Sequence, residues 1–308
     1  MKKVLIIGGT YFAGRVFAII ANQKGWELSF INRGTYSMEY LGNVKEYKAD
    51  RRVPGMLYGF PQGEYDAVVD FCAYEPGDCS SLLRSLNIRT KQYVLLSTAD
   101  VYDRSIRTMK DESAPLQDHM GNCMAADYMW KKRNLETEAE QVCTELGTGL
   151  TILRPAFIYG PFNYAPRESF YVERIVKGQP IPVPSDSDSE WNFVFVTDVA
   201  RAICACIEQQ DVSCGQAYNL SAPEIVTYKS YMDVLQKVTD RPFETRPVTV
   251  SEVLAQNIPL PFPLTADESE LFDGSLAARE LKLVYTPLRD GMEKTWNAFA
   301  PVFAQMGT

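Results

Sequence analysis

Hydrophobic and polar residues follow two different periods along the first hundred residues. Two segments, 13–24 and 78–88, repeat apolar residues at the three- and four-residue spacing of a helix that buries one face. Four other segments are short apolar runs, which indicates strands buried on both faces: 4–7, 27–31, 66–71 and 93–97. This alternation predicts a parallel sheet built from βαβ units, with its functional site at the carboxyl ends of the strands.

The pattern changes in the second half of the chain. A long charged helix is predicted at 128–146, ending at Gly147, and 151–161 is predicted to be a strand followed by a proline-bounded loop. From about residue 160, regular structure is interrupted by prolines at 161, 166, 180, 182 and 184. Helical spacing returns at three places, which are the segment after Asp198, 228–239 and 275–281.

The composition is that of a folded globular protein. Hydrophobic residues make up 46% and charged residues 23% of the 308, which excludes a disordered chain. The net charge of −8 provides no bulk basic surface, so nucleic acid is not an expected partner. No apolar run approaches the roughly 20 residues of a membrane span, and the start MKKVLIIGG is predicted to be a buried strand, not a secretion signal.

Cysteine and histidine usage limits the chemistry further. The seven cysteines are odd in number and form no C-x-x-C motif, which is typical of reduced thiols in a cytoplasmic protein. A single histidine, His119, makes a multi-histidine metal site or a Ser-His-Asp triad improbable, so we expect no metal.

A glycine-rich loop joins the first strand to the first helix, and its sequence is Gly8-Gly9-Thr10-Tyr11-Phe12-Ala13-Gly14. Glycine permits the tight turn and close packing of helix on strand, and the helix N-terminus presents free N–H groups to a pyrophosphate. The strand–loop–helix context therefore predicts dinucleotide binding. Tyr11 stands where such loops have their middle glycine, and its side chain is expected to point outward.

The second strand ends at Asn32-Arg33. A carboxylate at this place would bind the ribose hydroxyls and repel a 2′-phosphate, so its absence beside an arginine favours NADP weakly over NAD. Asp50 is a candidate for the adenine amino group. Arg51 is a candidate cofactor contact, although arginines in such a position are more often surface charges.

A candidate catalytic set lies in the middle of the chain. Tyr128 and Lys132 are four residues apart, which puts them on one helix face. An ammonium beside a tyrosine favours the phenolate and is expected to lower the pKa of Tyr128. Thr98, at the carboxyl end of the preceding strand, is placed to orient a substrate oxygen. Together with the glycine-rich loop, these residues indicate a hydride-transfer site.

At this point the sequence resembles the extended short-chain dehydrogenase/reductases, the NAD-dependent epimerase/dehydratase group. The resemblance is carried in order by VLIIGGTYFAG, YDAVVDFCAY, YVLLSTADVY, YMWKKRNLE, LRPAFIYGP and NFVFVTDVARAI, from residue 4 to about 225. It implies an α/β fold, with a Rossmann-type doubly wound parallel sheet in 1–155 and a return segment near 191–215. A smaller α/β substrate domain would occupy most of 156–308.

The resemblance also implies site residues, with Thr98, Tyr128 and Lys132 as the catalytic Thr-Tyr-Lys set. Further cofactor contacts would be Cys72, Ala73, Tyr74, Ser97, Pro155, Ala156 and Ile158. Substrate contacts would be Tyr74, Asp100, Phe157, Arg167 and Trp191. Many members dimerise through two helices per subunit, which here are 78–88 and 128–146.

Two departures make the substrate uncertain. Phe157 stands where nucleotide-sugar enzymes often have an asparagine that holds the diphosphate, and Trp191 stands where they often have an arginine. The loop GGTYFAG with the Asn-Arg-Gly strand end is similar to an atypical branch that includes chloroplast RNA-binding proteins.

Several functions therefore stay open. The main hypothesis is an NAD(P)-dependent epimerase or dehydratase acting on a sugar or nucleotide-sugar-like hydroxyl or carbonyl compound. An NADPH-dependent carbonyl reductase is the first alternative. A non-catalytic member that binds a dinucleotide, RNA or a regulatory partner is the second.

Overall fold

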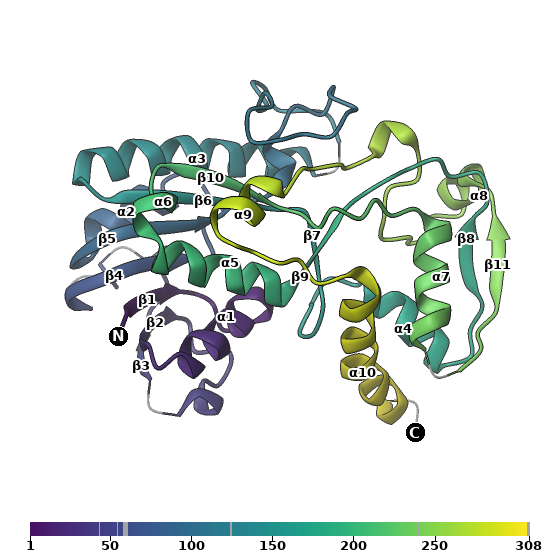
Figure 1. Cartoon of the computed structure of the whole chain (residues 1–308), viewed down its shortest axis with the longest axis horizontal. Helices are drawn as coiled ribbons and strands as arrows, with labels where there is room; N and C mark the ends of the chain where they lie inside the picture. The colour runs from purple at the N-terminus through teal and green to yellow at the C-terminus, as the bar shows by residue number, and fades with distance from the viewer. Residues whose placement is uncertain (43, 54, 58–60, 124, 240, 307–308) are drawn as a thin grey trace.

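The computed structural model describes residues 1–42, 44–53, 55–57, 61–123, 125–239 and 241–306 (Figure 1). Its centre is a seven-stranded parallel sheet with the strand order β10-β6-β5-β4-β1-β2-β3. The strands are β1 (Lys3–Ile7), β2 (Glu27–Asn32), β3 (Lys45–Lys48), β4 (Gln62–Asp70), β5 (Asn87–Leu96), β6 (Gly149–Pro155) and β10 (Gln216–Leu220). The predicted doubly wound α/β fold is confirmed.

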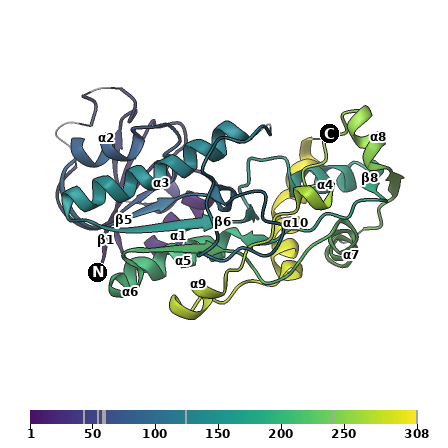
Figure 2. The same ribbon diagram turned by 90° about the horizontal axis from the view of Figure 1, so that it is seen from above.

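Helices cover both faces of this sheet, as Figures 1 and 2 show. One face is covered by α1 (Phe12–Gln23) and α5 (Val196–Glu208), and the other by α2 (Asp78–Ser85) and α3 (Ala126–Leu146). Successive strand residues point to opposite faces, so Val4 and Ile6 of β1 belong to the core under α1 while Leu5 and Ile7 belong to the core under α2 and α3. Helices therefore exclude water from both faces of the sheet, which explains why its central strands are continuous apolar runs.

The strand order reverses at β1, which has β2 on one side and β4 on the other. In open α/β sheets, ligands bind outside the carboxyl ends of the strands at such a reversal. The glycine-rich loop follows β1 directly, so the fold places it at the reversal.

Strands β4 and β5 are longer than their apolar runs. The predicted strands 66–71 and 93–97 are extended at their N-terminal ends to Gln62 and Asn87, through residues that are mostly exposed. Hydrophobicity identifies only the part of a strand that helices cover. For the same reason helix α2 ends at Ser85, before the predicted 88, because β5 already begins.

Most of the remaining elements form a smaller lobe beside the sheet, while α6 (Gln210–Ser213) and α9 (Ser275–Glu280) pack against β10 (Figure 1). Strand β7 (Phe157–Tyr159) pairs with β9 (Phe193–Phe195), and β8 (Ile181–Pro184) pairs with β11 (Thr245–Val248). The helices of the second half are α4 (Glu168–Val176), α6 (Gln210–Ser213), α7 (Tyr228–Val238), α8 (Val250–Ala255), α9 (Ser275–Glu280) and α10 (Leu288–Met306). Three 3-10 turns complete the list, η1 (Glu39–Leu41), η2 (Ala99–Val101) and η3 (Ala266–Glu268).

Two expectations for this lobe need correction. The loop expected after Pro155 contains β7, and the proline-rich segment 180–184 contains β8. Proline lacks an N–H donor and so is tolerated on a strand that pairs along one edge. In the described residues β8 pairs only with β11, which is why Pro182 and Pro184 fit there.

Trp191 also lies elsewhere than expected. The structure buries it completely, with its ring stacked on Phe262 at 5.0 Å between centroids and edge-on to Tyr228 at 5.2 Å. The predicted substrate contact is therefore a core residue of the smaller lobe. Inside the lobe, other side chains cover the whole Trp191 ring, so the ring buries more apolar area than it would at the wall of an open cavity.

Candidate active site

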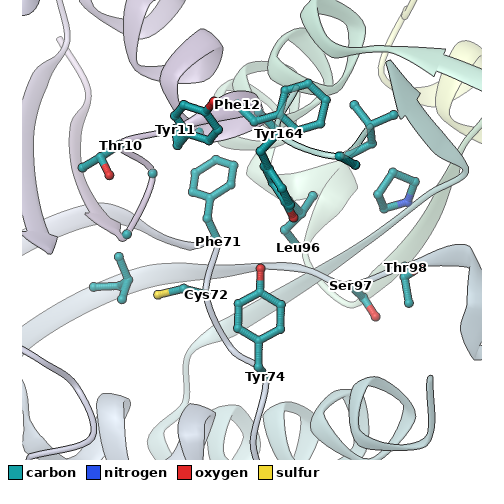
Figure 3. Close-up of a pocket in the computed structure, with 18 of the residues that line it drawn as sticks. Thr10, Tyr11, Phe12, Phe71, Cys72, Tyr74, Leu96, Ser97, Thr98 and Tyr164 are labelled. Atoms are coloured by element: carbon teal, nitrogen blue, oxygen red, sulfur yellow. The ribbon is translucent and has the colours of Figure 1, made fainter. Parts of the chain in front are cut away.

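One cavity of about 690 Å³ opens at the carboxyl ends of β1, β4, β5 and β6. Two predicted site residues, Ala73 and Trp191, do not line it, and Ala73 is fully buried. All other predicted site residues do: Gly8, Thr10, Tyr11, Phe12, Ala13, Gly14, Asn32, Arg33, Asp50, Arg51, Cys72, Tyr74, Ser97, Thr98, Asp100, Tyr128, Lys132, Pro155, Ala156, Phe157, Ile158 and Arg167. Predicted residues as far apart in sequence as Gly8 and Arg167 thus line one cavity, part of which is drawn in Figure 3.

The glycine-rich loop has a geometry that suits an anionic phosphate group. Gly8 and Gly9 have φ values of +72° and +67°, a region that favours glycine. A Cβ on Gly14 would lie 2.3 Å from the Cα of Gly9, so only glycine permits this contact of helix and loop. Helix α1 then starts with no acidic residue in its first turn. Free N–H groups and the helix dipole can therefore face a pyrophosphate.

Tyr11 is compatible with this loop. Its backbone is extended, with φ −140°, so the position does not require glycine. Its ring stacks on Tyr36 at 4.8 Å and lies 5.9 Å from Tyr164, which comes from the segment between β7 and α4. Figure 3 shows Tyr11, Phe12 and Tyr164 together on one side of the cavity and Tyr74 facing them. Tyr11 thus joins the loop to the smaller lobe through aromatic contacts.

The far end of the cavity, at the C-termini of β2 and β3, carries positive side chains. Arg33 and Arg52 line it and are exposed. The Asn32 amide is already engaged, because its nitrogen donates to Glu46 Oε1 at 2.9 Å and its oxygen accepts from the Gly34 N–H at 2.6 Å. The Asn32 side chain therefore stabilises the turn that follows β2. Of the pair Asn32-Arg33, only Arg33 has a side chain available to contact a ligand.

Arg51 is not a surface charge, which corrects the sequence interpretation. Its side chain is 7% exposed, and its Nη1 donates to both carboxylate oxygens of Asp70 at 2.8 Å. The Tyr93 hydroxyl donates to the same carboxylate at 2.7 Å. A carboxylate buried at the end of β4 needs a paired countercharge, and Arg51 supplies it. Arg51 therefore lines the cavity as part of a buried ion pair.

Helix α3 is fixed to the sheet by a second buried ion pair. Arg154 of β6 contacts Glu136 of α3 at 2.8 Å, and the Ser97 hydroxyl donates to Glu136 at 2.6 Å. Since Glu136 lies one turn beyond Lys132, this network holds the face of α3 that carries the candidate catalytic residues. Ser97 serves this anchoring network at the edge of the cavity.

The candidate catalytic residues converge in the cavity. Thr98 caps η2, and its Oγ1 donates to Asp100 Oδ2 at 2.9 Å. Lys132 Nζ donates to the Leu96 carbonyl at 3.0 Å and lies 4.6 Å from the centroid of the Tyr74 ring. Burial lowers the pKa of Lys132 to about 8. A buried amino group is thus held one helical turn from Tyr128, with Leu96 and Tyr74 as its neighbours.

The pKa of Tyr128 is shifted opposite to the expectation. It is raised above its ordinary value, first by desolvation and then by the negative charge of Asp100, while a hydrogen bond with Thr98 acts in the lowering direction. Lys132 does not lower it in this structure because its Nζ is turned to Leu96 and Tyr74. Tyr128 therefore holds its proton in the free protein.

Some cavity residues escaped the sequence analysis, and they come from parts of the chain without a motif: Thr35, Tyr36, Asn163, Tyr164, Ala165, Glu270 and Phe272. No local sequence signal marks Glu270. Its segment is brought to the cavity by strand-like bridges with Trp191 and Lys110, which are distant in sequence. His119 has a side chain 84% exposed and lies outside the cavity lining. Cys72 lines the cavity, and burial raises its pKa to about 12, so it stays a thiol.

Residues 4–221 match the profile of the NAD dependent epimerase/dehydratase family, which is most of the chain. The protein belongs to this family. The resemblance to the extended short-chain dehydrogenase/reductases is thereby confirmed, and the glycine-rich loop, η2 and α3 all fall inside the matched segment.

Solved structures of the family's fold agree with this assignment. UDP-glucose 4-epimerase from Thermotoga maritima, solved with UDP-glucose, has a TM-score of 0.75 and 18% identity over 97% of this chain and 99% of that one. A putative epimerase from Burkholderia cenocepacia has a TM-score of 0.78 and 19% identity over 97% and 98%. At these identities the likeness concerns the fold.

One curated relative differs in its described role. It is the chloroplast stem-loop binding protein of 41 kDa b from Arabidopsis thaliana, 27% identical over 241 residues. The match covers 74% of this chain and 60% of the relative, so the chain spans less than two thirds of that protein's length.

The described residues contain neither a membrane-spanning helix nor a cluster of metal ligands. None of their helices is long and apolar enough to cross a membrane. No group of three or more His, Cys, Asp or Glu side chains among them is arranged to hold a metal ion.

Proposed function

We propose that this protein is a nicotinamide dinucleotide-dependent oxidoreductase of the epimerase/dehydratase type, acting on a sugar or nucleotide-sugar-like compound at a hydroxyl or carbonyl carbon. One observation carries the proposal. Thr98, Tyr128 and Lys132 line the same cavity as a glycine-rich loop whose geometry suits a pyrophosphate. The first half of the cavity would hold the dinucleotide and the second half would hold the substrate.

The residues present fit the cofactor along its whole length. The loop Gly8–Gly14 would bind the pyrophosphate, Asp50 the adenine, and Pro155 with Ile158 would flank the nicotinamide. Arg33 and Arg52 line the adenosine end, and the carboxylate that would repel a 2′-phosphate is absent from the end of β2. These features favour NADP over NAD. When bound, the nicotinamide supplies or takes the hydride.

Side chains of the protein would transfer the proton to and from the substrate oxygen. Tyr128 would donate its proton to the substrate oxygen when a carbonyl is reduced, and would accept a proton when a hydroxyl is oxidised. The Lys132 ammonium, four residues along the same helix, would stabilise the phenolate that donation leaves behind. Thr98 would orient the substrate oxygen by donating to it the hydroxyl proton that it gives to Asp100 in the free protein.

The type of cycle would show in how the cofactor is held. An epimerase or a dehydratase returns the hydride to the same substrate, and a retained dinucleotide suits that reaction. A carbonyl reductase must release its oxidised cofactor in every turnover.

The first experiment is calorimetric titration of the purified protein with NAD(H) and NADP(H), after its absorbance is checked for a dinucleotide carried through purification. Tight, co-purified dinucleotide would support the internal redox cycle. Exchangeable, selective NADPH binding would support the reductase alternative. A protein that binds neither cofactor would contradict the proposal.

The named relative motivates a second candidate, which is RNA binding by this fold without catalysis. The net charge of −8 weighs against it, because phosphate backbones are bound by basic surfaces. Titration with a stem-loop RNA at low ionic strength tests it. Absent or salt-insensitive binding would remove this candidate.

Three further expectations belong to this proposal. The partner would be a small-molecule substrate, the compartment would be the cytoplasm, and the assembly would be a homodimer through α2 and α3. Light scattering of the purified protein tests the dimer directly.

A further inference from the structure

A segment from the last fifth of the chain reaches the substrate half of the cavity. Glu270 forms strand-like bridges with Trp191, and Phe272 does so with Lys110. The Glu270 N–H donates to the Glu190 carbonyl at 2.9 Å, and the Asn192 N–H donates to the Glu270 carbonyl at 3.1 Å. The backbone of this segment is therefore fixed on both sides, and the Glu270 side chain meets the cavity in a set position.

Two carboxyl groups lie close together at this end. Glu270 is 7% exposed and forms an ion pair with Arg104 at 2.5 Å. Burial, and after it the charge of Asp100, raises the pKa of Glu270 to about 7, while Arg104 and Lys110 act to lower it. Lys110 is buried with its Nζ 5.0 Å from the centroid of the Phe272 ring. The positive charges of Arg104 and Lys110 thus compensate the negative charges of Glu270 and Asp100.

Asp100 has spare hydrogen-bonding capacity toward the cavity. Its Oδ2 accepts from Thr98 Oγ1 at 2.9 Å, and no ion pair within 4 Å is found for it among the described residues. Thr98 has one hydroxyl proton, which it donates to Asp100 in a hydrogen bond. Oxygen acceptors on Thr98, Asp100 and Glu270 therefore line the same cavity as Tyr128, and the charge of Asp100 acts on both Tyr128 and Glu270.

We infer that Asp100 and Glu270 form a recognition pair that binds hydroxyl groups of the substrate next to the reacting carbon. Carboxylates accept hydrogen bonds from hydroxyls and repel another carboxylate. A neutral, polyhydroxylated carbon skeleton suits this pair, whereas an acidic sugar such as a uronic acid does not. The inference rests on the proposed function, since it concerns the substrate of the same site.

The test uses the full-length protein loaded with the dinucleotide that it binds. The probes are two pairs in which a hydroxymethyl group is replaced by a carboxylate: D-galactose with D-galacturonic acid, and UDP-glucose with UDP-glucuronic acid. Pre-steady-state reduction of the bound oxidised nicotinamide, followed by its near-ultraviolet absorbance, gives the maximal rate of hydride transfer and the half-saturating concentration for each probe, which serve as kcat and KM here. The wild type is expected to favour the neutral member of a pair by roughly tenfold or more in kcat/KM.

Glu270→Gln and Asp100→Asn remove one acceptor charge each. Either variant is expected to raise KM for the neutral probe roughly tenfold, with kcat for Glu270→Gln within about threefold, and to reduce the preference over the acidic probe. Glu140→Gln makes the same charge change on the exposed face of α3 and should leave KM unchanged. Melting curves check that each variant is folded.

Arg104→Lys separates recognition from a purely structural ion pair. It keeps the countercharge of Glu270 but loses the guanidinium geometry. If Glu270 serves only to anchor Arg104, this variant will raise KM as much as Glu270→Gln does, and the inference is overturned. Equal KM values in Glu270→Gln and Glu140→Gln would also overturn it. If the dinucleotide binds but no probe reduces it, the proposed substrate class fails and the inference fails with it.

Discussion

The two halves of the cavity are built in different ways. The half that would hold the dinucleotide is formed mainly by backbone: a loop with two glycines at positive φ, a helix N-terminus and the ends of adjacent strands. The half that would hold the substrate is formed by side chains from η2, α3 and a segment near residue 270, held in place by ion pairs and bridges. A backbone site follows from local sequence, whereas a side-chain site depends on which distant segments meet.

The halves also differ in relation to the family. The glycine-rich loop and the catalytic set lie inside the matched residues 4–221, but Glu270 lies outside them. The candidate catalytic residues and Asp100 thus lie in the segment that matches the family. Glu270, the other member of the proposed recognition pair, comes from the segment that follows it.

The largest effect on dinucleotide binding should follow from Gly14→Ala, in the half that would hold the dinucleotide. The new Cβ would overlap the Gly9 backbone, which no side-chain movement can relieve. We expect a cost of about 3 kcal/mol, equivalent to a loss of dinucleotide affinity of roughly a hundredfold. Calorimetric titration measures it. Gly121→Ala, with open space around the new Cβ, is the control and should bind normally.

Tyr128→Phe should act only in the substrate half. Removing the proton carrier is expected to lower kcat by roughly 10²–10⁴-fold while dinucleotide affinity stays unchanged. Tyr40→Phe, an exposed tyrosine outside the cavity lining, is the matched control. Turnover by Tyr128→Phe at the wild-type rate would show that another group moves the proton.

Arg33→Ala should separate the two cofactors. If Arg33 meets a 2′-phosphate, NADP affinity falls roughly tenfold and NAD affinity does not change, because a charged hydrogen bond contributes about 1.5–3 kcal/mol. Arg89→Ala, whose side chain is 90% exposed and outside the cavity lining, should change neither affinity. Equal loss for both cofactors would indicate a contact with the shared pyrophosphate.

The pH dependence of kcat/KM should report both Glu270 and Lys132. Glu270, facing Asp100, Arg104 and Lys110, has a pKa of about 7, and substrate recognition needs its ionised form, so kcat/KM rises through pH 7. Lys132, with a pKa of about 8, must stay protonated, so kcat/KM falls above pH 8.

The Glu270→Gln variant tests which group produces each limb of this pH profile. Asp70, Cys79, Cys72 and Glu136 act on Lys132, and all of them raise its pKa. Glu270→Gln should remove the rising limb and leave the falling limb in place. A rising limb that survives in this variant would belong to another group.

The smallest effect is expected where the halves touch through aromatic rings. Tyr164→Ala removes contacts with Tyr11 and Phe12 at 5.9 and 6.0 Å between centroids. An aromatic pair contributes about 0.5–1.5 kcal/mol, so dinucleotide release measured by stopped flow should accelerate roughly twofold to tenfold. Tyr164→Phe should release at the wild-type rate, since it keeps the ring.

The sequence predicted the sheet well where helices cover it and poorly elsewhere. Apolar runs marked β1, β2 and the inner parts of β4 and β5, because burial on both faces requires them. The edge strand β3, with the sequence KEYK, and the single-edged β8 leave no such pattern. Pairing with a neighbour, not composition, makes these segments strands.

The same division holds within the site. Local sequence was sufficient to predict the glycine-rich loop, because tight turns and close packing demand particular residues at fixed positions. It was also sufficient to place Tyr128 and Lys132 on one helix face. It misjudged Arg51 and Trp191, whose environments are created by Asp70 and Phe262 far along the chain.

The sequence by itself thus determined the fold class, the glycine-rich loop and the spacing of Tyr128 and Lys132 on one helix, since each of these depends on neighbouring residues. Only the tertiary structure decided that Tyr128 keeps its proton, that Arg51 is buried, and that Glu270 enters the cavity. The physical reason is that burial and charge pairing depend on residues distant in sequence, which only the folded chain brings together.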